Sequence, residues 1–157
     1  MFEHVGLKQL PDYFAKIHTL LKESALVVNH GITTSDIDSG WMGLGAGEFI
    51  DRYVFPDGEL PHLSAVLRDM AAAGFEMTDA ESLRRHYART CSTWAGALES
   101  HVDRAVHEVG EKRVRIWQIY LAGCAYAFAN GWMNVYQLLA CKSTTLSINH
   151  PLPLTRE

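Results

Sequence analysis

Cysteine is scarce in this sequence, and its spacing excludes a disulfide framework and a zinc site built on cysteine pairs. The three cysteines, Cys91, Cys124 and Cys141, are odd in number, lie in apolar surroundings and form no CxxC pair. Such cysteines are typical of free, buried thiols in a reducing compartment. The eight histidines show no HExxH or similarly tight spacing, so we assign no metal site.

Long apolar runs and an excess of positive charge are also absent. No run reaches the roughly 18 apolar residues that a membrane-spanning helix needs. Lys8, Asp12 and Lys16 interrupt the first apolar stretch, so we expect no signal peptide. The net charge of −4 offers no basic face and makes nucleic acid a poor partner. With 157 residues, 48% of them apolar, the chain suits one folded domain with one core.

The apolar pattern predicts helices that alternate with buried strands. Helical spacing is found in residues 10–24, 62–74, 86–110 and 111–131, and a short helix with a turn is expected in 47–61. Short apolar runs predict three mainly parallel strands near residues 25–29, 75–80 and 133–141, with the last one possible as an antiparallel edge strand. The fold class is therefore α/β, with helices on both faces of a three-layer structure.

The number of strands bears on the domain organisation. Three strands correspond to half of a doubly wound, Rossmann-like domain, which we assign to residues 1–145. The last residues, 146–157, carry two prolines and are expected to form a loose tail.

Two places in the sequence carry candidate functional residues: His30, and the adjacent pair Glu3 and His4. His30 is predicted at the carboxyl end of the first strand, where ligands of open α/β sheets bind. The alternative is a strand-end histidine that bonds a backbone carbonyl. Glu3 and His4 precede the first helix, and for Glu3 the alternative is a favourable charge at a helix N-terminus.

A third candidate lies on the helix that begins near residue 86. Tyr87, Thr90, Cys91 and Trp94 fall on one helical face. We interpret Cys91 and Trp94 as core residues, whereas Tyr87 lies in the first turn and can reach a site. Cys91 has no basic neighbour that would favour a thiolate, so it is not expected to be a nucleophile. The sequence GLGAG, residues 43–47, follows a polar loop instead of a strand, which argues against a nucleotide-binding loop.

Several stretches together resemble the C-terminal part of the cyclopropane-fatty-acyl-phospholipid synthase family, which includes the mycolic acid cyclopropane synthases. They are MFEHVG with the helix YFAKIHTLLK, then HGIT, FIDRYVFPDGELP, HYARTCSTW and RIWQIYLAGCAYAFANGWMNVYQLL. The most specific of them is FIDRYVFPDGELP, because no general structural rule requires that combination. The resemblance covers nearly the whole chain except the tail.

The resemblance implies a class I methyltransferase fold that binds S-adenosylmethionine. It implies transfer of the cofactor's methyl group to the double bond of an unsaturated phospholipid acyl chain, followed by proton loss and ring closure. In this family a bicarbonate ion takes the proton. Its glutamate, histidine and tyrosine ligands match Glu3, His30 and Tyr87, and Ile32 matches a backbone ligand. The resemblance further implies that Trp41, Phe49 and Tyr53 line the acyl channel.

These borrowed roles agree with the chemistry of the side chains. A small anion needs donors, which an imidazole and a phenol supply. A carboxylate can accept a hydrogen bond from protonated bicarbonate and orient it. A carbocation is stabilised beside aromatic rings and an anion.

The chain departs from the family pattern in one respect. The glycine-rich cofactor loop, the first strands and a cysteine ligand of the family all precede the stretch that matches MFEHVG. We therefore expect these residues to be the middle and end of a longer enzyme, and the 157-residue chain to be inactive by itself. The expected location is cytoplasmic, peripheral to the inner membrane surface.

Two other interpretations remain open. The chain could be a non-catalytic remnant or assembly module that pairs through the exposed edge of the strand at residues 25–29. It could also be a small-molecule methyltransferase of the same fold.

Overall fold

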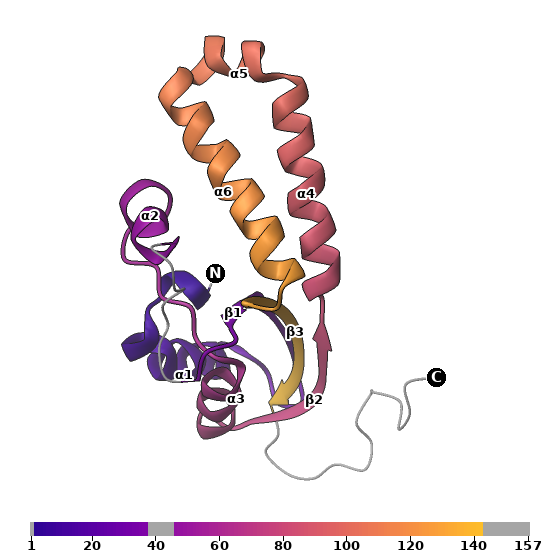
Figure 1. Cartoon of the computed structure of the whole chain (residues 1–157). Coiled ribbons are helices and arrows are strands. Elements are labelled where there is room, and N and C mark those ends of the chain that lie inside the picture. Colours follow the sequence, from indigo (N-terminus) through magenta and orange to yellow (C-terminus); the bar gives the residue numbers. More distant parts are fainter. Residues whose placement is uncertain (1, 38–45, 143–157) are drawn as a thin grey trace.

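The chain forms a small sheet from which a long helical hairpin projects (Figure 1). The computed structural model describes residues 2–37 and 46–142. The helices are η1 (Phe2–His4), η2 (Leu7–Gln9), α1 (Leu10–Leu20), α2 (Ala46–Tyr53), α3 (Leu63–Ala72), α4 (Arg84–Ser100), α5 (Val102–Val109) and α6 (Glu111–Ala129). The strands are β1 (Leu26–Thr34), β2 (Phe75–Ser82) and β3 (Met133–Lys142).

The three predicted strands are present, but the sheet is antiparallel. β3 lies between β1 and β2 and runs antiparallel to both. The prediction of a mainly parallel sheet is therefore wrong, although β1 and β2 point the same way without pairing with each other. The antiparallel direction that the sequence allowed for the last strand is confirmed, but this strand is central instead of at the edge. A central strand is buried on both faces, so its continuous apolar run resembles that of a parallel strand.

The helical hairpin explains the direction of β3. Helices α4 and α6 lead the chain away from the end of β2 and back to the same place (Figure 1). There the Leu83 amide donates a hydrogen bond of 2.8 Å to the Val135 carbonyl. A strand that starts beside the end of β2 and pairs with β2 has to run in the opposite direction.

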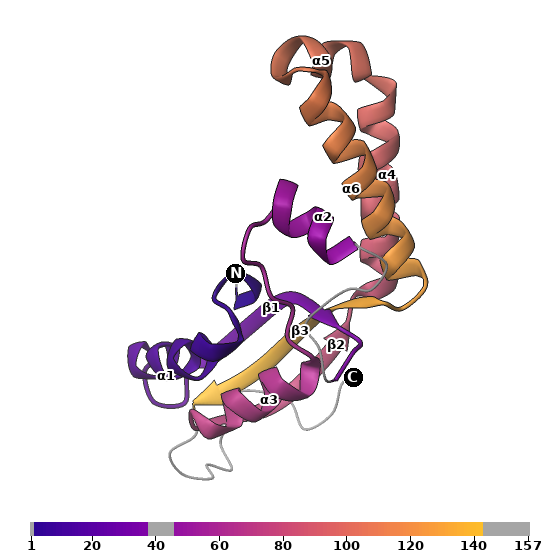
Figure 2. The same ribbon diagram turned by 60° about the vertical axis from the view of Figure 1, so that its left-hand side comes forward.

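Side chains of β3 alternate between two cores on opposite faces of the sheet. Leu138 and Ala140 pack with residues of α1 and α3 on one face. Met133 and Val135 pack with residues of α4 and α6 on the other face. Helices thus lie on both faces, and Figure 2 shows α1 and α3 along the sheet with the hairpin rising from one end.

Two helices of the hairpin, α4 and α5, stand where the sequence predicts a single helix. The expected helix at residues 86–110 breaks at His101, whose backbone dihedrals (φ −127°, ψ 26°) are not helical. At the base of the hairpin, Arg84 Nη1 donates to the carbonyls of Phe128 (2.6 Å) and Ala129 (3.1 Å). These carbonyls lie in the last turn of α6, so Arg84 joins the two helices where they meet the sheet.

The N-terminal turn is held against β1 by a close approach of Phe2 to Gly31. A Cβ atom at Gly31 would lie 2.1 Å from Cε1 of Phe2, so only glycine leaves room for this ring. Phe2 is buried. This contact places Glu3, the next residue, beside the strand that carries His30.

Strand β1 is longer than predicted. It continues to Thr34, so His30 lies within the strand and not at its carboxyl end. Trp41 and the tail that we assigned to residues 146–157 lie outside the described residues.

Candidate functional site

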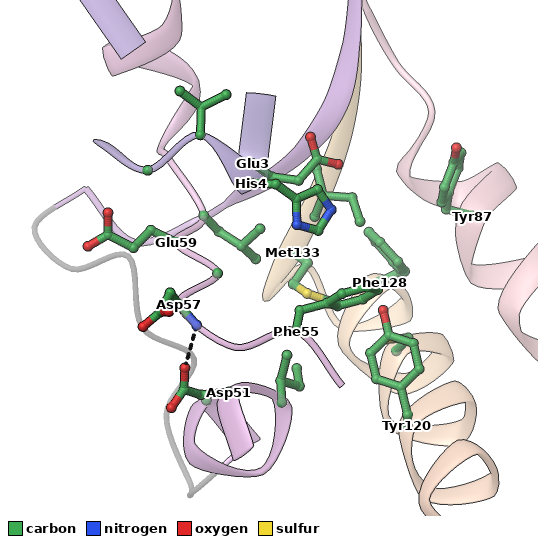
Figure 3. Close-up of a pocket in the computed structure, with 18 of the residues that line it drawn as sticks. Glu3, His4, Asp51, Phe55, Asp57, Glu59, Tyr87, Tyr120, Phe128 and Met133 are labelled. Carbon is green, nitrogen blue, oxygen red and sulfur yellow. Dashed lines mark hydrogen bonds between the residues drawn. The ribbon is translucent and has the colours of Figure 1, made fainter. Parts of the chain in front are cut away.

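A cavity of about 920 Å³ opens where the hairpin meets the N-terminal turn and the segment from α2 to Leu60 (Figure 3). The hairpin contributes Tyr87, Cys91, Trp94, Trp117, Tyr120, Leu121, Cys124 and Phe128. Ile32 and Met133 contribute from the sheet, and Glu3 and His4 from η1. The cavity is therefore mainly apolar on the side of the hairpin and polar on the side of the N-terminal turn.

The hydroxyl of Tyr87 lies 2.9 Å from Nε2 of His30, within hydrogen-bond distance. His30 comes from the middle of β1 and Tyr87 from the first turn of α4. The ring of Tyr87 also makes an edge contact with Phe128, at 5.7 Å between centroids. The sequence left open that His30 bonds a backbone carbonyl at a strand end. In the structure, the partner of its Nε2 is the Tyr87 hydroxyl instead.

The sequence-predicted residues come together at this cavity. Glu3, Ile32 and Tyr87 all line it, and His30 is bonded to Tyr87. Figure 3 shows Glu3 on the sheet side of the cavity and Tyr87 on the first turn of α4. Glu3 and Tyr87 thus line one cavity, and His30 reaches it through its contact with Tyr87. That these three residues form one small polar pocket, and the chemical roles assigned to them, stay predictions.

Two carboxylates at the cavity hold the surrounding loops. Asp51 Oδ1 accepts a hydrogen bond of 2.8 Å from the Asp57 amide, and Glu59 Oε2 accepts one of 2.8 Å from the Leu7 amide. Both bonds tie a carboxylate to a backbone amide of a neighbouring segment. We therefore assign Asp51 and Glu59 to the architecture of the cavity.

Aromatic rings form a continuous wall on the hairpin side. Tyr120 makes edge-to-face contacts with Trp117 at 5.3 Å and with Phe55 at 6.0 Å between centroids. Phe55 also contacts the ring of His4 at 5.1 Å. Burial strongly raises the pKa of Tyr120, so its hydroxyl stays protonated across the physiological range.

The two cysteines of the cavity are poor nucleophiles. Burial raises the pKa of the Cys124 thiol to about 11, and it also raises the pKa of Cys91. The nucleophile is the thiolate, which these pKa values disfavour at neutral pH. The prediction that Cys91 is a core residue is confirmed, but the same prediction for Trp94 is wrong, because Trp94 lines the cavity and is 55% exposed.

Two of the residues predicted to line the acyl channel, Phe49 and Tyr53, lie outside the wall of the cavity. Phe49 and Tyr53 pack against each other, at 5.4 Å between centroids, and neither lines the cavity. Their neighbours Ile50 and Phe55 do line it. The sequence did signal the hairpin wall, since Trp117, Tyr120, Leu121, Cys124 and Phe128 share one helical face, but spacing alone assigns a face to core and cavity alike.

Two classes of site were sought in the part of the chain that the structure describes. No group of three or more His, Cys, Asp or Glu residues there could hold a metal ion. Within the same residues, no helix has the length and apolar character needed to cross a membrane.

Comparison with known proteins gives one family. The family model described as mycolic acid cyclopropane synthetase matches residues 1–138. A probable fatty acid methyltransferase of Pseudomonas putida is 52% identical over 157 residues, which cover 100% of this chain and 40% of the relative.

Solved structures point the same way. The cyclopropane synthase MmaA2 of Mycobacterium tuberculosis superposes with a TM-score of 0.84 at 33% identity, over 90% of this chain and 53% of that protein. The mycolic acid cyclopropane synthase CmaA1, in complex with SAH and CTAB, gives a TM-score of 0.81 at 31% identity, over 90% and 52% of the two chains. The chain thus spans about half the length, or less, of these relatives.

Proposed function

The chain belongs to the mycolic acid cyclopropane synthetase family, and on this premise we propose that it forms the acyl-binding and proton-accepting part of a lipid methyltransferase. Its fold is the corresponding part of the Rossmann-like domain of S-adenosylmethionine-dependent methyltransferases. The proposed reaction is transfer of a methyl group to the double bond of an unsaturated acyl chain of a phospholipid, with formation of a cyclopropane ring.

One observation carries this proposal. Of the four residues that the family resemblance assigns to an anion site, Glu3, Ile32 and Tyr87 line one cavity, and His30 lies within hydrogen-bond distance of Tyr87. They come from three separate elements, and nothing in helix or strand periodicity requires them to meet. The cavity beside them is lined by aromatic and aliphatic side chains, as an acyl chain requires.

The donor set fits a small anion such as bicarbonate. Only one proton lies between His30 Nε2 and Tyr87 Oη. The tautomer of His30 therefore decides whether the Tyr87 hydroxyl donates to His30 or accepts from it. We assign the proton to Nε2 of His30, because the Tyr87 hydroxyl is then free to donate to an anion in the cavity. Glu3 would accept a hydrogen bond from the hydroxyl of bicarbonate, and the bound ion would supply a base.

The fit to S-adenosylmethionine is partial. When bound, this cofactor supplies an electrophilic methyl group on sulfur. Within residues 2–37 and 46–142, no glycine-rich turn leads from a strand directly into a helix, which is the usual cradle for such a cofactor. We propose that the methyl group approaches the cavity from outside these residues, and that the described residues hold the acyl chain and the proton acceptor.

The aromatic wall suits the charge that this reaction develops. Methyl transfer to an alkene leaves a positive charge on the neighbouring carbon until a proton is lost from the new methyl group. A ring face within about 6 Å stabilises a cation, by roughly 2 kcal/mol or more when water is excluded. Tyr87, Phe128 and Tyr120 present such rings to the cavity.

The acyl channel is proposed on the same wall. Ile50, Phe55 and Trp117 line the cavity. Trp41, Phe49 and Tyr53 stay in the proposal through the family resemblance alone. The acyl chain reaches them only if the channel extends beyond the cavity described above.

The test is methyl transfer by the protein at its full gene-encoded length. Labelled S-adenosylmethionine is added to vesicles of unsaturated phospholipid, and the acyl chains are analysed by mass spectrometry after methanolysis. We expect label in acyl chains that have gained one CH₂ and lost the double bond. Label in a branched chain that keeps a double bond would refute ring formation. Label only in small molecules would refute the lipid substrate.

A second candidate function rests on the edge of the sheet. In the described sheet β1 pairs along its length with β3 only, apart from an isolated parallel bridge from Thr34 at its end to His62, and Val28 on this strand is 56% exposed. Exposed edges of this kind pair with other chains. A non-catalytic assembly module would self-associate through β1 and leave acyl chains unlabelled. Analytical ultracentrifugation beside the methyl-transfer assay separates the two functions.

A further inference from the structure

Helix α6 buries one side, and a second side that is basic at its start and apolar further along is exposed. Val114, Leu121, Cys124, Ala127 and Phe128 are buried. A second set, Lys112, Arg115, Ile119, Ala122 and Tyr126, follows at steps of three and four, so its members share one face. All five are exposed. We call this set the outer stripe of α6.

The outer stripe ends in an exposed aromatic pair. Ile119 is 60% exposed and Tyr126 is 58% exposed. Trp132, just after α6, packs edge-to-face on Tyr126 at 5.3 Å between centroids and is itself exposed. The hairpin stands clear of the sheet over most of its length (Figure 2), so no described element covers the stripe.

The hairpin is also basic in an acidic chain. Residues 84–129 contain seven Lys and Arg against four Asp and Glu, a net charge of +3, whereas the whole chain has −4. The stripe begins with two of these basic residues, Lys112 and Arg115. Arg115 bonds Glu111 through Nε and Nη2, and Lys112 adds a further positive charge beside that pair.

We infer that the outer stripe of α6 lies against the surface of an anionic lipid bilayer. Tyrosine and tryptophan are enriched at membrane interfaces, where the apolar ring is buried and the polar group stays hydrated. Lysine and arginine near an anionic surface contribute about 1 kcal/mol each. From Lys112 to Tyr126 the stripe runs roughly 21 Å along the helix, which suits contact in the plane of a membrane. The inference rests on the proposed function in one respect, that the substrate is a membrane lipid.

A second copy of the chain fits this surface less well. Two hairpins of net charge +3 repel each other, whereas anionic headgroups attract them. The apolar part of the stripe consists of Ile119, Ala122 and Tyr126, with Trp132 beside it. This is a small patch compared with the roughly 800 Å² per partner of a stable protein interface.

The experiment is vesicle flotation with the purified full chain and no cofactor. The vesicles contain saturated phosphatidylcholine alone or mixed equally with saturated phosphatidylglycerol, so binding is measured without any reactive double bond. The variant Arg115→Ser/Ile119→Ser removes one basic and one apolar side chain, four residues apart, from the stripe. Its control, Lys16→Ser/Leu20→Ser, makes the same kind of change at the same spacing on exposed residues of α1. Circular dichroism shows whether both variants keep the fold.

We expect binding to the anionic vesicles, weakened by salt, with little binding to phosphatidylcholine alone. The α6 variant is expected to bind roughly tenfold more weakly, and the α1 control to bind as the parent does. Equal losses in both variants, or equal binding to both vesicles, would overturn the inference. A dimer in ultracentrifugation that the α6 variant abolishes would assign the stripe to a second copy instead.

The outcome is distinguishable from that of the proposed function. Methyl transfer to detergent-dispersed lipid without vesicle binding refutes the docking surface and leaves the enzyme in place. Vesicle binding without methyl transfer supports the docking surface and refutes the proposed reaction.

Discussion

The Tyr87 hydroxyl lies 2.9 Å from Nε2 of His30, although 57 positions separate the two residues in the chain. The pair joins the middle of a strand to the first turn of the hairpin, at the edge of a cavity that Tyr87 lines. If His30 holds its proton on Nε2, Tyr87 keeps its own proton for an anion. The pair is therefore the element of the site most open to direct test.

Replacement of Tyr87 by phenylalanine tests the hydroxyl. In the full-length enzyme, Tyr87→Phe and His30→Ala are each expected to lower kcat roughly 10²-fold, because proton acceptance is lost, with little change in the KM for lipid. The measurement is initial rate against lipid concentration. Tyr136→Phe is the control, since Tyr136 packs in the core on the other face of the sheet. A rise in KM with kcat unchanged would mean that the pair serves docking of the lipid.

The contact between Phe2 and Gly31 predicts a local packing defect. Gly31→Ala would bring its Cβ within 2.1 Å of the buried Phe2 ring, so we expect the free energy of unfolding to fall by roughly 1–3 kcal/mol. Urea unfolding measures this loss. Gly96→Ala is the control, because a Cβ on Gly96 meets nothing within 4 Å and lies in a helix, where alanine is favourable. Equal stability of parent and Gly31→Ala would refute the placing of Phe2.

The position of the cavity can be tested with two phenylalanines of one segment. Phe55 lines the cavity and Phe49 does not. We expect Phe55→Ala to weaken binding of a fluorescent acyl chain by roughly tenfold, because an aromatic contact in the wall of the cavity is lost. Phe49→Ala is expected to weaken it less. If the order is reversed, the acyl channel follows the residues that the family resemblance selected and not the cavity.

The Cys124 thiol predicts an alkaline loss of stability. Its pKa in the folded chain is raised to about 11 by burial, above the value of an exposed thiol. The unfolded chain therefore loses this proton first as pH rises, and the folded state is penalised from about pH 9 up to about pH 11. The full effect is on the order of 3 kcal/mol.

Urea unfolding from pH 8 to pH 10.5 measures this slope. Cys124→Ala is expected to be less stable at pH 8 because of the cavity it creates, and to lose less stability between pH 9 and pH 10 than the parent. Identical slopes in parent and variant would show that Cys124 is not the group that titrates. Tyr120, whose pKa is also raised by burial, is expected to contribute only at higher pH.

The 157-residue chain by itself is expected to bind S-adenosylmethionine weakly or not at all, and to show no methyl transfer. Positioning of the reacting groups is worth roughly 7–11 kcal/mol in such reactions, and the described residues offer no glycine-rich strand–helix turn to position the cofactor. Calorimetry with the isolated chain measures the affinity. Turnover near that of an intact relative would place the cofactor site within these residues, and GLGAG at 43–47 would be the first stretch to test.

Most of the secondary structure follows from the periodicity of the sequence, whereas the candidate site residues come from the family resemblance, and their roles stay predictions. Local periodicity identifies α1, α3 and α6 because each buries one stripe of side chains, which a 3.6-residue repeat reveals. Glu3, His30 and Tyr87 were chosen from short motifs of the family, and in the structure Glu3 and Tyr87 line one cavity, with His30 in contact with Tyr87. Apolar composition also identified β3 as a buried strand.

The central position of β3 and the walls of the cavity depend on packing between distant segments, and the sequence allowed an antiparallel last strand without requiring it. A run of apolar residues is the same in a buried parallel strand and in a central antiparallel one, so the direction depended on the return of the chain through α4 and α6. The positions of Trp94 and Phe55 in the wall of the cavity likewise depend on which distant segments pack together. Helical spacing assigns a side chain to a face, but whether that face meets a core, a cavity or solvent depends on which distant segment packs opposite it.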